Sequence, residues 1–156
     1  MWVTGGPAEL KVFIAGSIES SELLMFLAQL VEEEGHEPLP WNKPGLFPLG
    51  GYLFETLQQI GKEVDAAIVI FNEDDKVWYR DDMTKQPRDN VLMEYGLLSG
   101  ILGTRKTIVG FKGSPKIASD LKGVMLCDLN RQYKAQAELK QWLKRLSTAR
   151  TEAGIH

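Results

Sequence analysis

This chain of 156 residues has a single cysteine, Cys127, and only two histidines, His36 and His156. One cysteine excludes an internal disulfide framework and suits a reducing compartment. The two histidines lie far apart, and no cysteine or acidic cluster beside them has metal-ligand spacing, so we predict no metal site. For Cys127, near the end of an expected strand, we predict a small buried residue rather than a nucleophile.

The chain also lacks a basic charge excess and long apolar runs. Its net charge is -3, which gives no basic field to attract nucleic acid. No stretch approaches the ~18 apolar residues of a membrane span, and residues 1–7 lack the basic start and apolar run of a signal peptide. We therefore expect a cytoplasmic protein that binds neither nucleic acid nor membrane.

What the chain does have is the composition of one globular domain, in which short apolar strands alternate with helical patterns. We expect strands at 11–15, 37–41, 66–71, 107–111 and 124–126, and helices from Ser20 or Ser21 to Gly35, at 52–63, from about 89 to Gly103 and at 134–146. This alternation predicts an α/β fold: a parallel sheet of about five strands with helices on both faces. Pro38 and Pro40 limit the second strand to an edge.

The predicted domain spans residues 11–147, between a loose lead-in at 1–10 and a polar tail or linker at 148–156. Residues 72–89 form a long polar loop, and loops of that length are usually functional or mobile. Ligands of parallel sheets bind outside the carboxyl ends of the strands. Gly16 and Ser17 lie there, where their backbone N–H groups can bind a phosphate, although a glycine after a strand also serves a simple turn.

Glu94 is the most informative single residue. It is the only charged residue between Val91 and Thr104, in a run that is apolar on every side. A helix of that kind is buried, and a carboxylate is almost never fully buried unless it is paired or used. The residues alone leave two readings near even: a functional group at a cleft, or an acid that complements its helix N-terminus.

Several phrases of the sequence resemble one family. They are KVFIAGS (11–17), WN (41–42), FP (47–48), GGY (50–52), DAAIVIF (65–71) followed by DD (74–75), and RDNV (88–91) with Glu94 and GL (96–97). Together they resemble the prokaryotic TIR-like nucleotide-binding domain, the effector module of cyclic-nucleotide-triggered anti-phage systems, over about residues 11–130. The resemblance implies a flavodoxin-like TIR fold and NAD+ glycohydrolase activity, with Glu94 as the catalytic residue.

The resemblance also implies partners. NAD+ would be a substrate, with no cofactor required. A fused cyclic-nucleotide sensor, absent from this chain, would switch the domain on by assembling it into an oligomer or filament. One carboxylate is enough for the chemistry, because nicotinamide leaves as a neutral base and needs no proton, unlike the leaving group of an ordinary glycoside. We expect Glu94 to be ionised at neutral pH, so that it stabilises the cation developing on the ribose.

Other side chains have two readings each in such a site. Trp41 and Phe47 can form a flat wall for nicotinamide or adenine, or anchor their loop to the core. Asp74 and Asp75 can accept hydrogen bonds from ribose hydroxyls, or be solvated. Arg88 can reach a phosphate or pair with Asp89, whereas Asp89 and Asn90 are expected to cap the helix that carries Glu94.

Two other functions compete with the NAD+ glycohydrolase. A nucleoside 2-deoxyribosyltransferase-like enzyme also opens with a KVFIAG strand and also uses a glutamate on a helix. A non-catalytic TIR module would serve only for self-association. The loop at 41–51 and the RDNV phrase favour the TIR-like enzyme over the transferase, and an intact Glu94 argues against a pure scaffold.

Overall fold

The computed structural model describes residues 8–16, 20–47, 52–72, 76–79, 82–85, 89–113 and 124–155; of 76–79, 82–85, 89–90 and 154–155 it describes the backbone alone. Five parallel strands form the central sheet in the order β2-β1-β3-β6-β7. Their bounds are β1 Lys11–Ala15, β2 Glu37–Pro40, β3 Ala66–Asn72, β6 Thr107–Lys112 and β7 Met125–Asp128. The predicted α/β architecture is confirmed, and the proline-containing strand β2 lies at an edge as expected.

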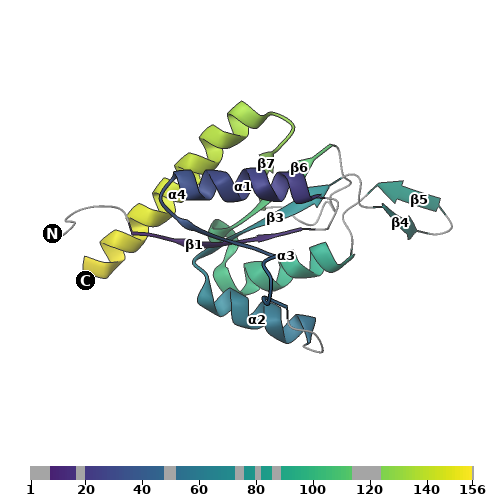
Figure 1. The fold of residues 1–156 in the computed structure, drawn as a ribbon, viewed down its shortest axis with the longest axis horizontal. Helices are drawn as coiled ribbons and strands as arrows, with labels where there is room; N and C mark the ends of the chain where they lie inside the picture. Colours follow the sequence, from purple (N-terminus) through teal and green to yellow (C-terminus); the bar gives the residue numbers. More distant parts are fainter. Residues whose placement is uncertain are drawn as a thin grey trace.

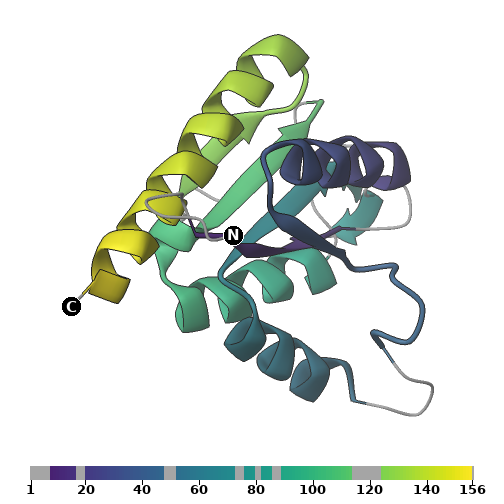
Figure 2. The same cartoon turned by 60° about the vertical axis from the view of Figure 1, so that its left-hand side comes forward.

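Helices cover both faces of this sheet. α1 (Ser21–Glu33) and α4 (Gln132–Ile155) lie on one face, and α2 (Leu53–Glu63) and α3 (Asp89–Leu102) lie on the other, as Figures 1 and 2 show. A 3-10 turn, η2 (Thr104–Lys106), leads from α3 into β6. None of the described helices is long and apolar enough to cross a membrane.

The central strand β3 divides the hydrophobic core into two clusters. Every residue of β3 is buried, because side chains alternate between two covered faces. Ile68 and Ile70 pack with the leucines of α1 and α4, whereas Val69 and Phe71 pack with α2 and α3. This is why the sequence reads as one continuous apolar run at 66–71.

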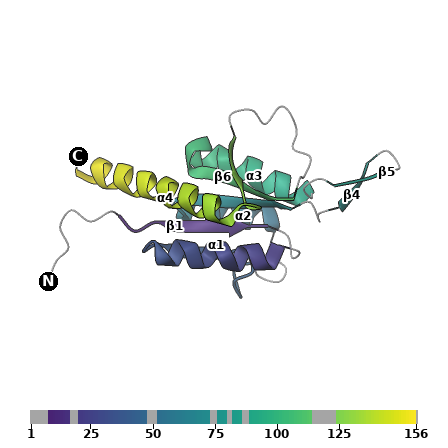
Figure 3. The same ribbon diagram turned by 90° about the horizontal axis from the view of Figure 1, so that it is seen from above.

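The predicted polar loop at 72–89 is wrong in part. It contains an antiparallel pair of strands, β4 (Lys76–Tyr79) and β5 (Asp82–Lys85). The hairpin projects from the sheet past the carboxyl end of β3 (Figures 1 and 3). Its strands are only four residues long and carry mixed polar and apolar residues, so no clear alternation marks them in the sequence.

The predicted polar tail after residue 147 is also wrong in its local structure, because α4 continues to Ile155. Two hydroxyls of the last turns join this helix to the amino end of β1. Thr151 Oγ1 accepts a hydrogen bond from the Ala8 N–H at 2.8 Å, and the Ser147 hydroxyl donates to the Ala8 carbonyl. The charged and polar sequence of this stretch hides the helix, since only a narrow side of it is buried.

Candidate functional site

The candidate site lies where the carboxyl ends of β1 and β3 meet. The chain steps from β1 to β2 on one side, and all later strands of the sheet lie on the other side of β1. This reversal is the topological switch point at which α/β sheets bind ligands. Gly16 directly follows β1, and Asn72 is the last residue of β3. Both therefore lie at the switch point.

Glu94 lies in the second turn of α3, on the side of the helix that packs against the sheet. Val91 and Leu98, about one turn away on either side, are fully buried in the cluster beneath α3. Glu94 itself is only 7% exposed, and no hydrogen bond or ion pair joins it to another described residue. Attraction to the helix N-terminus fades after the first turn, so it does not account for a carboxyl in this position.

Burial raises the pKa of the Glu94 carboxyl from its ordinary value of 4.5 to about 7, because the ionised form loses its water. Protonated and ionised forms are therefore comparably populated in the free protein at pH 7, which differs from the expected full ionisation. A cation placed beside the carboxyl lowers the pKa again. The arrangement can therefore hold a carboxyl that becomes charged when a cationic ligand arrives.

Asn72 and Ser20 are polar residues of this site that the sequence analysis did not single out. Asn72 is 5% exposed and Ser20 is 1% exposed, and the Asn72 side-chain amide lies 3.4 Å from the Ser20 hydroxyl oxygen. Ser20 precedes α1 as expected, but its hydroxyl makes no capping hydrogen bond. In the sequence, Asn72 could have been found as the polar residue that ends an otherwise apolar central strand, at the end of the sheet where ligands bind.

Gly16 has a packing reason to be glycine. A Cβ atom there would lie 3.2 Å from Ile70 Cβ and 3.5 Å from Ser20 Cβ, so β1 approaches β3 and the start of α1 closely. The predicted contact of its N–H group with a phosphate stays a prediction. The neighbouring Ser17 lies outside the described residues.

Trp41 and Phe47 are both partly buried. Trp41 packs against both core clusters, and its backbone N–H donates to the Ile14 carbonyl at 2.9 Å. Its indole Nε1 is buried and has no hydrogen-bond partner among the described residues. Phe47 packs against the cluster beneath α2 and α3. Both contacts agree with the core-anchor reading of these aromatics, and their binding role stays a prediction.

The remaining predicted site residues fall partly or wholly outside the described part of the chain. Asp74, Asp75 and Arg88 lie outside it altogether. Asn90 and Asp89 are the first two residues of α3, so the backbone agrees with their place at the helix start, but their side chains are not described. Among the predicted residues that are described, Gly16 and Trp41 follow β1 and β2 at the carboxyl end of the sheet, and Glu94 lies in the second turn of α3.

Cys127 and His36 stand apart from this chemistry. Burial, with smaller contributions from Glu138 and Asp128, raises the pKa of the Cys127 thiol to about 12, so the thiol is protonated at neutral pH, as a structural cysteine is. His36 accepts a hydrogen bond at Nδ1 from the Leu10 N–H, 3.0 Å away at the other end of the sheet. Among the described residues, no group of three or more metal-ligand side chains converges.

Comparison with known proteins identifies the family. Residues 11–131 match the TIR domain of the CAP12/Pycsar effector protein family. The chain belongs to this family. The match ends one residue before α4 begins, so the TIR-domain match covers all five strands of the sheet but not the closing helix.

Several named relatives share this region. The chain is 33% identical over 115 residues to the Pycsar effector protein PaPycTIR of Pseudomonas aeruginosa, which covers 72% of this chain and 37% of that protein. It is 32% identical over 130 residues to XpPycTIR of Xanthomonas perforans, with 78% and 41% covered. It is 31% identical over 120 residues to CD-NTase-associated protein 12 of Niabella drilacis, with 74% and 38% covered. The matched region thus spans about two fifths of each relative.

Proposed function

We propose that this domain is the NAD+ glycohydrolase part of an anti-phage effector, with Glu94 as its catalytic carboxylate. The observation that carries the proposal is a lone carboxyl, 7% exposed, held on the sheet-facing side of α3 without a described partner. A charge in that place costs stability, so a catalytic use explains its presence better than packing does. The defence role is supported by relatives named as Pycsar effectors and CD-NTase-associated proteins.

The chemistry follows from the charge of the substrate. The nicotinamide ring of NAD+ is positively charged, and bond cleavage moves positive character onto the ribose. A carboxylate beside the anomeric carbon stabilises that cation electrostatically, and the poorly solvated setting of Glu94 strengthens the attraction. The same positive charge favours ionisation of Glu94. Binding of the substrate therefore prepares the group that the reaction needs, and water then completes the hydrolysis.

The proposal includes the partners implied by the family. A cyclic-nucleotide sensor on another part of the protein would assemble several copies of this domain, and assembly would activate it. The loops at 41–51 and 72–89 are the segments that we expect a neighbouring copy to contact near the site. A site shared between copies makes activity rise steeply with protein concentration, because the competent species is the oligomer.

The test is NAD+ cleavage by the domain at increasing concentration, alone and with enforced clustering. Glu94→Gln is compared with Glu55→Gln, which changes an exposed glutamate of α2. We expect Glu94→Gln to lower turnover by roughly 10²-fold or more, and Glu55→Gln to leave it unchanged. Near-normal turnover by Glu94→Gln would exclude Glu94 as the catalytic group.

The same preparation separates the two competing functions. Base exchange between a deoxynucleoside and a free base, without loss of NAD+, would establish the 2-deoxyribosyltransferase reading. Specific activity that stays high down to the dilute monomer would show that one copy holds a complete site. Self-association without cleavage of either substrate would favour the scaffold reading.

A further inference from the structure

A groove runs between α4 and the edge of the sheet, on the face opposite Glu94. It encloses about 390 Å³, and we call it the α4–β7 groove. It is lined by Arg105, Met125, Trp142, Arg145, Leu146 and Ala149. Trp142 is fully buried and forms its base. The indole N–H of Trp142 donates to the Arg105 carbonyl at 2.9 Å, which fixes η2 beside the groove.

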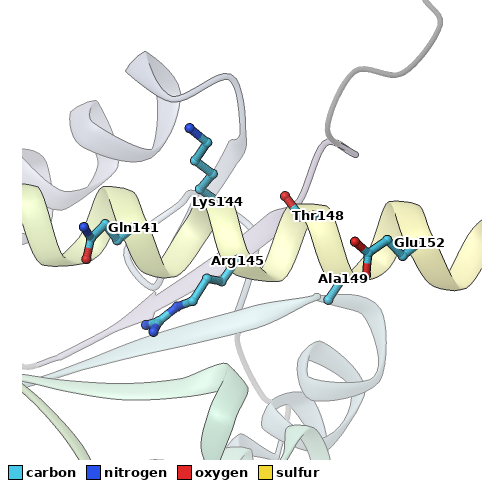
Figure 4. A pocket seen from close by; sticks show the side chains of 6 residues that line it. All are labelled: Gln141, Lys144, Arg145, Thr148, Ala149 and Glu152. Atoms are coloured by element: carbon cyan, nitrogen blue, oxygen red, sulfur yellow. The ribbon is translucent and has the colours of Figure 1, made fainter.

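Two arginines also line the groove beside this apolar base. Arg105 and Arg145 are exposed, and neither has an ion pair with a described residue. Figure 4 shows Arg145 and Lys144 pointing to opposite sides of α4, so only Arg145 lies on the groove side. The guanidinium group binds carboxylates through two parallel N–H donors. The groove therefore fits an acidic surface.

The chain carries such a surface at the end of α1. Glu32 and Glu33 close the helix, and Glu37 begins β2 after a short turn. All three are exposed, and we call them the acidic tip. The last turn of α1 contains no basic residue. Acids at a helix C-terminus are repelled by the helix dipole. The acidic tip thus stands where local electrostatics disfavour it, and a cationic partner would relieve that repulsion.

We propose that the α4–β7 groove of one copy binds the acidic tip of a second copy. Two arginines that have no ion pair among the described residues complement the charge of three exposed carboxylates, and they lie beside an apolar base. This inference deepens the assembly part of the proposed function by naming two surfaces that join the copies, and their association can be measured without NAD+ cleavage.

The two surfaces cannot satisfy each other within one molecule. Glu34, which follows Glu33 of the acidic tip, lines with Lys144 a separate cavity between the turn after α1 and α4, and Lys144 lies on the side of α4 opposite Arg145. A contact between two different surfaces is heterologous, so a bound pair still has one free groove on one copy and one free tip on the other. The assembly can therefore grow head to tail, or close into a ring where the rotation between copies allows it.

The test is self-association of the whole chain, measured by sedimentation over a range of protein concentrations at low and high salt. Arg145→Glu and Glu33→Arg are each compared with a control on the same helix, Lys140→Glu and Glu22→Lys, which alter exposed residues outside both surfaces. We expect each test variant to weaken association about tenfold or more, and the wild-type association to weaken as salt rises. The controls should associate normally, and circular dichroism with thermal melting checks that all variants are folded.

A mixture of the two test variants tests whether the acidic tip is the surface that the α4–β7 groove binds. Arg145→Glu keeps a native tip and Glu33→Arg keeps a native groove, and the two reversed charges are also complementary, so mixing the variants should restore association that neither shows alone. Absence of that rescue would overturn the proposed pairing. Association that is unchanged in Arg145→Glu would overturn the use of the groove, and a wild-type chain that stays monomeric at every concentration would overturn the proposal altogether.

Discussion

The buried polar groups at the two ends of the sheet are paired to different extents. At the amino end, His36 Nδ1 accepts from the Leu10 N–H, and Asp65 Oδ2 accepts from the Lys11 N–H at 2.8 Å. At the carboxyl end, Glu94 is buried without a described partner, and the Trp41 indole N–H has none. Polar groups buried without partners cost free energy, whereas paired ones stabilise. The amino-end groups therefore stabilise the fold, whereas Glu94 and the Trp41 indole lack partners among the described residues and could be satisfied by a ligand in the proposed site.

The amino end also joins distant parts of the chain. Arg150, in the last turns of α4, lies 2.7 Å from Asp65 Oδ2 and donates to the Glu9 carbonyl. Together with the contacts of Thr151 and Ser147 to Ala8, this ties the end of α4 to the start of β1. Substitutions at the two ends test this difference. Removing an unpaired polar side chain at the carboxyl end should leave the stability of the fold intact or improved, whereas removing a paired one at the amino end should reduce it.

The largest expected effect on stability is at Glu94. Its pKa is about 7 in the folded chain against an ordinary value of 4.5. The folded state therefore holds more protons between these pH values, and its stability falls as pH rises from 4.5 to 7. Above pH 7 the loss reaches about 3 kcal/mol. Glu94→Gln removes this loss, so at pH 8 the variant should melt up to about 10 °C higher than the wild type.

The control for that prediction is the same comparison at pH 4.5. There the wild-type carboxyl is protonated in the folded state, so the difference between the two melting temperatures should shrink. An equal difference at both pH values would show that charge burial is not its cause. Glu94→Gln would then have acted through packing.

The next effect is at Asp65, on the amino end. Asp65→Ala removes the acceptor of the Lys11 N–H and the partner of Arg150, so it should destabilise the fold by about 1–3 kcal/mol in denaturant titration. The matched control is Glu138→Ala, whose ion pair with Lys134 spans 3.8 Å on an exposed side of α4; this should cost well under about 1 kcal/mol. Equal effects of the two would show that the amino-end contacts add no more than a surface pair.

A smaller effect concerns the pH dependence of the proposed cleavage. If the reaction needs ionised Glu94, then kcat/KM should fall below pH 7, because the Glu94 carboxyl of the substrate-free protein becomes protonated. At pH 6, kcat/KM should be about tenfold below its plateau. The kcat profile should bend at a lower pH, since bound cationic substrate favours the ionised form. The measurement is initial rate at saturating and limiting NAD+. A kcat/KM that is flat from pH 5 to pH 8 would contradict the assignment.

The sequence predicted the central sheet well, but it predicted neither the β4–β5 hairpin nor the last turns of α4. The difference has a physical reason. Strand β3 is buried on both faces, so its residues had to be apolar and its pattern was clear. The later part of α4 buries few side chains, Ser147 among them, and its helical period is hidden by exposed polar residues. The position of Glu94 was predictable from one acid in an apolar run. Its pKa was not, because desolvation depends on the packing around it.

The smallest expected effect is at Trp41, and it separates the two readings of that residue. Trp41→Phe keeps an aromatic ring against the core clusters and removes the buried indole N–H, which lacks an acceptor. Loss of an unsatisfied donor should offset the lost packing volume, so the free energy of unfolding should change by less than about 1 kcal/mol. If the tryptophan is only a core anchor, the KM for NAD+ should also be unchanged. Steady-state kinetics with clustered protein checks this, with Phe47→Leu as the matched change in the same loop. A KM raised severalfold by Trp41→Phe, at unchanged stability, would show instead that the carboxyl end keeps this N–H for the substrate.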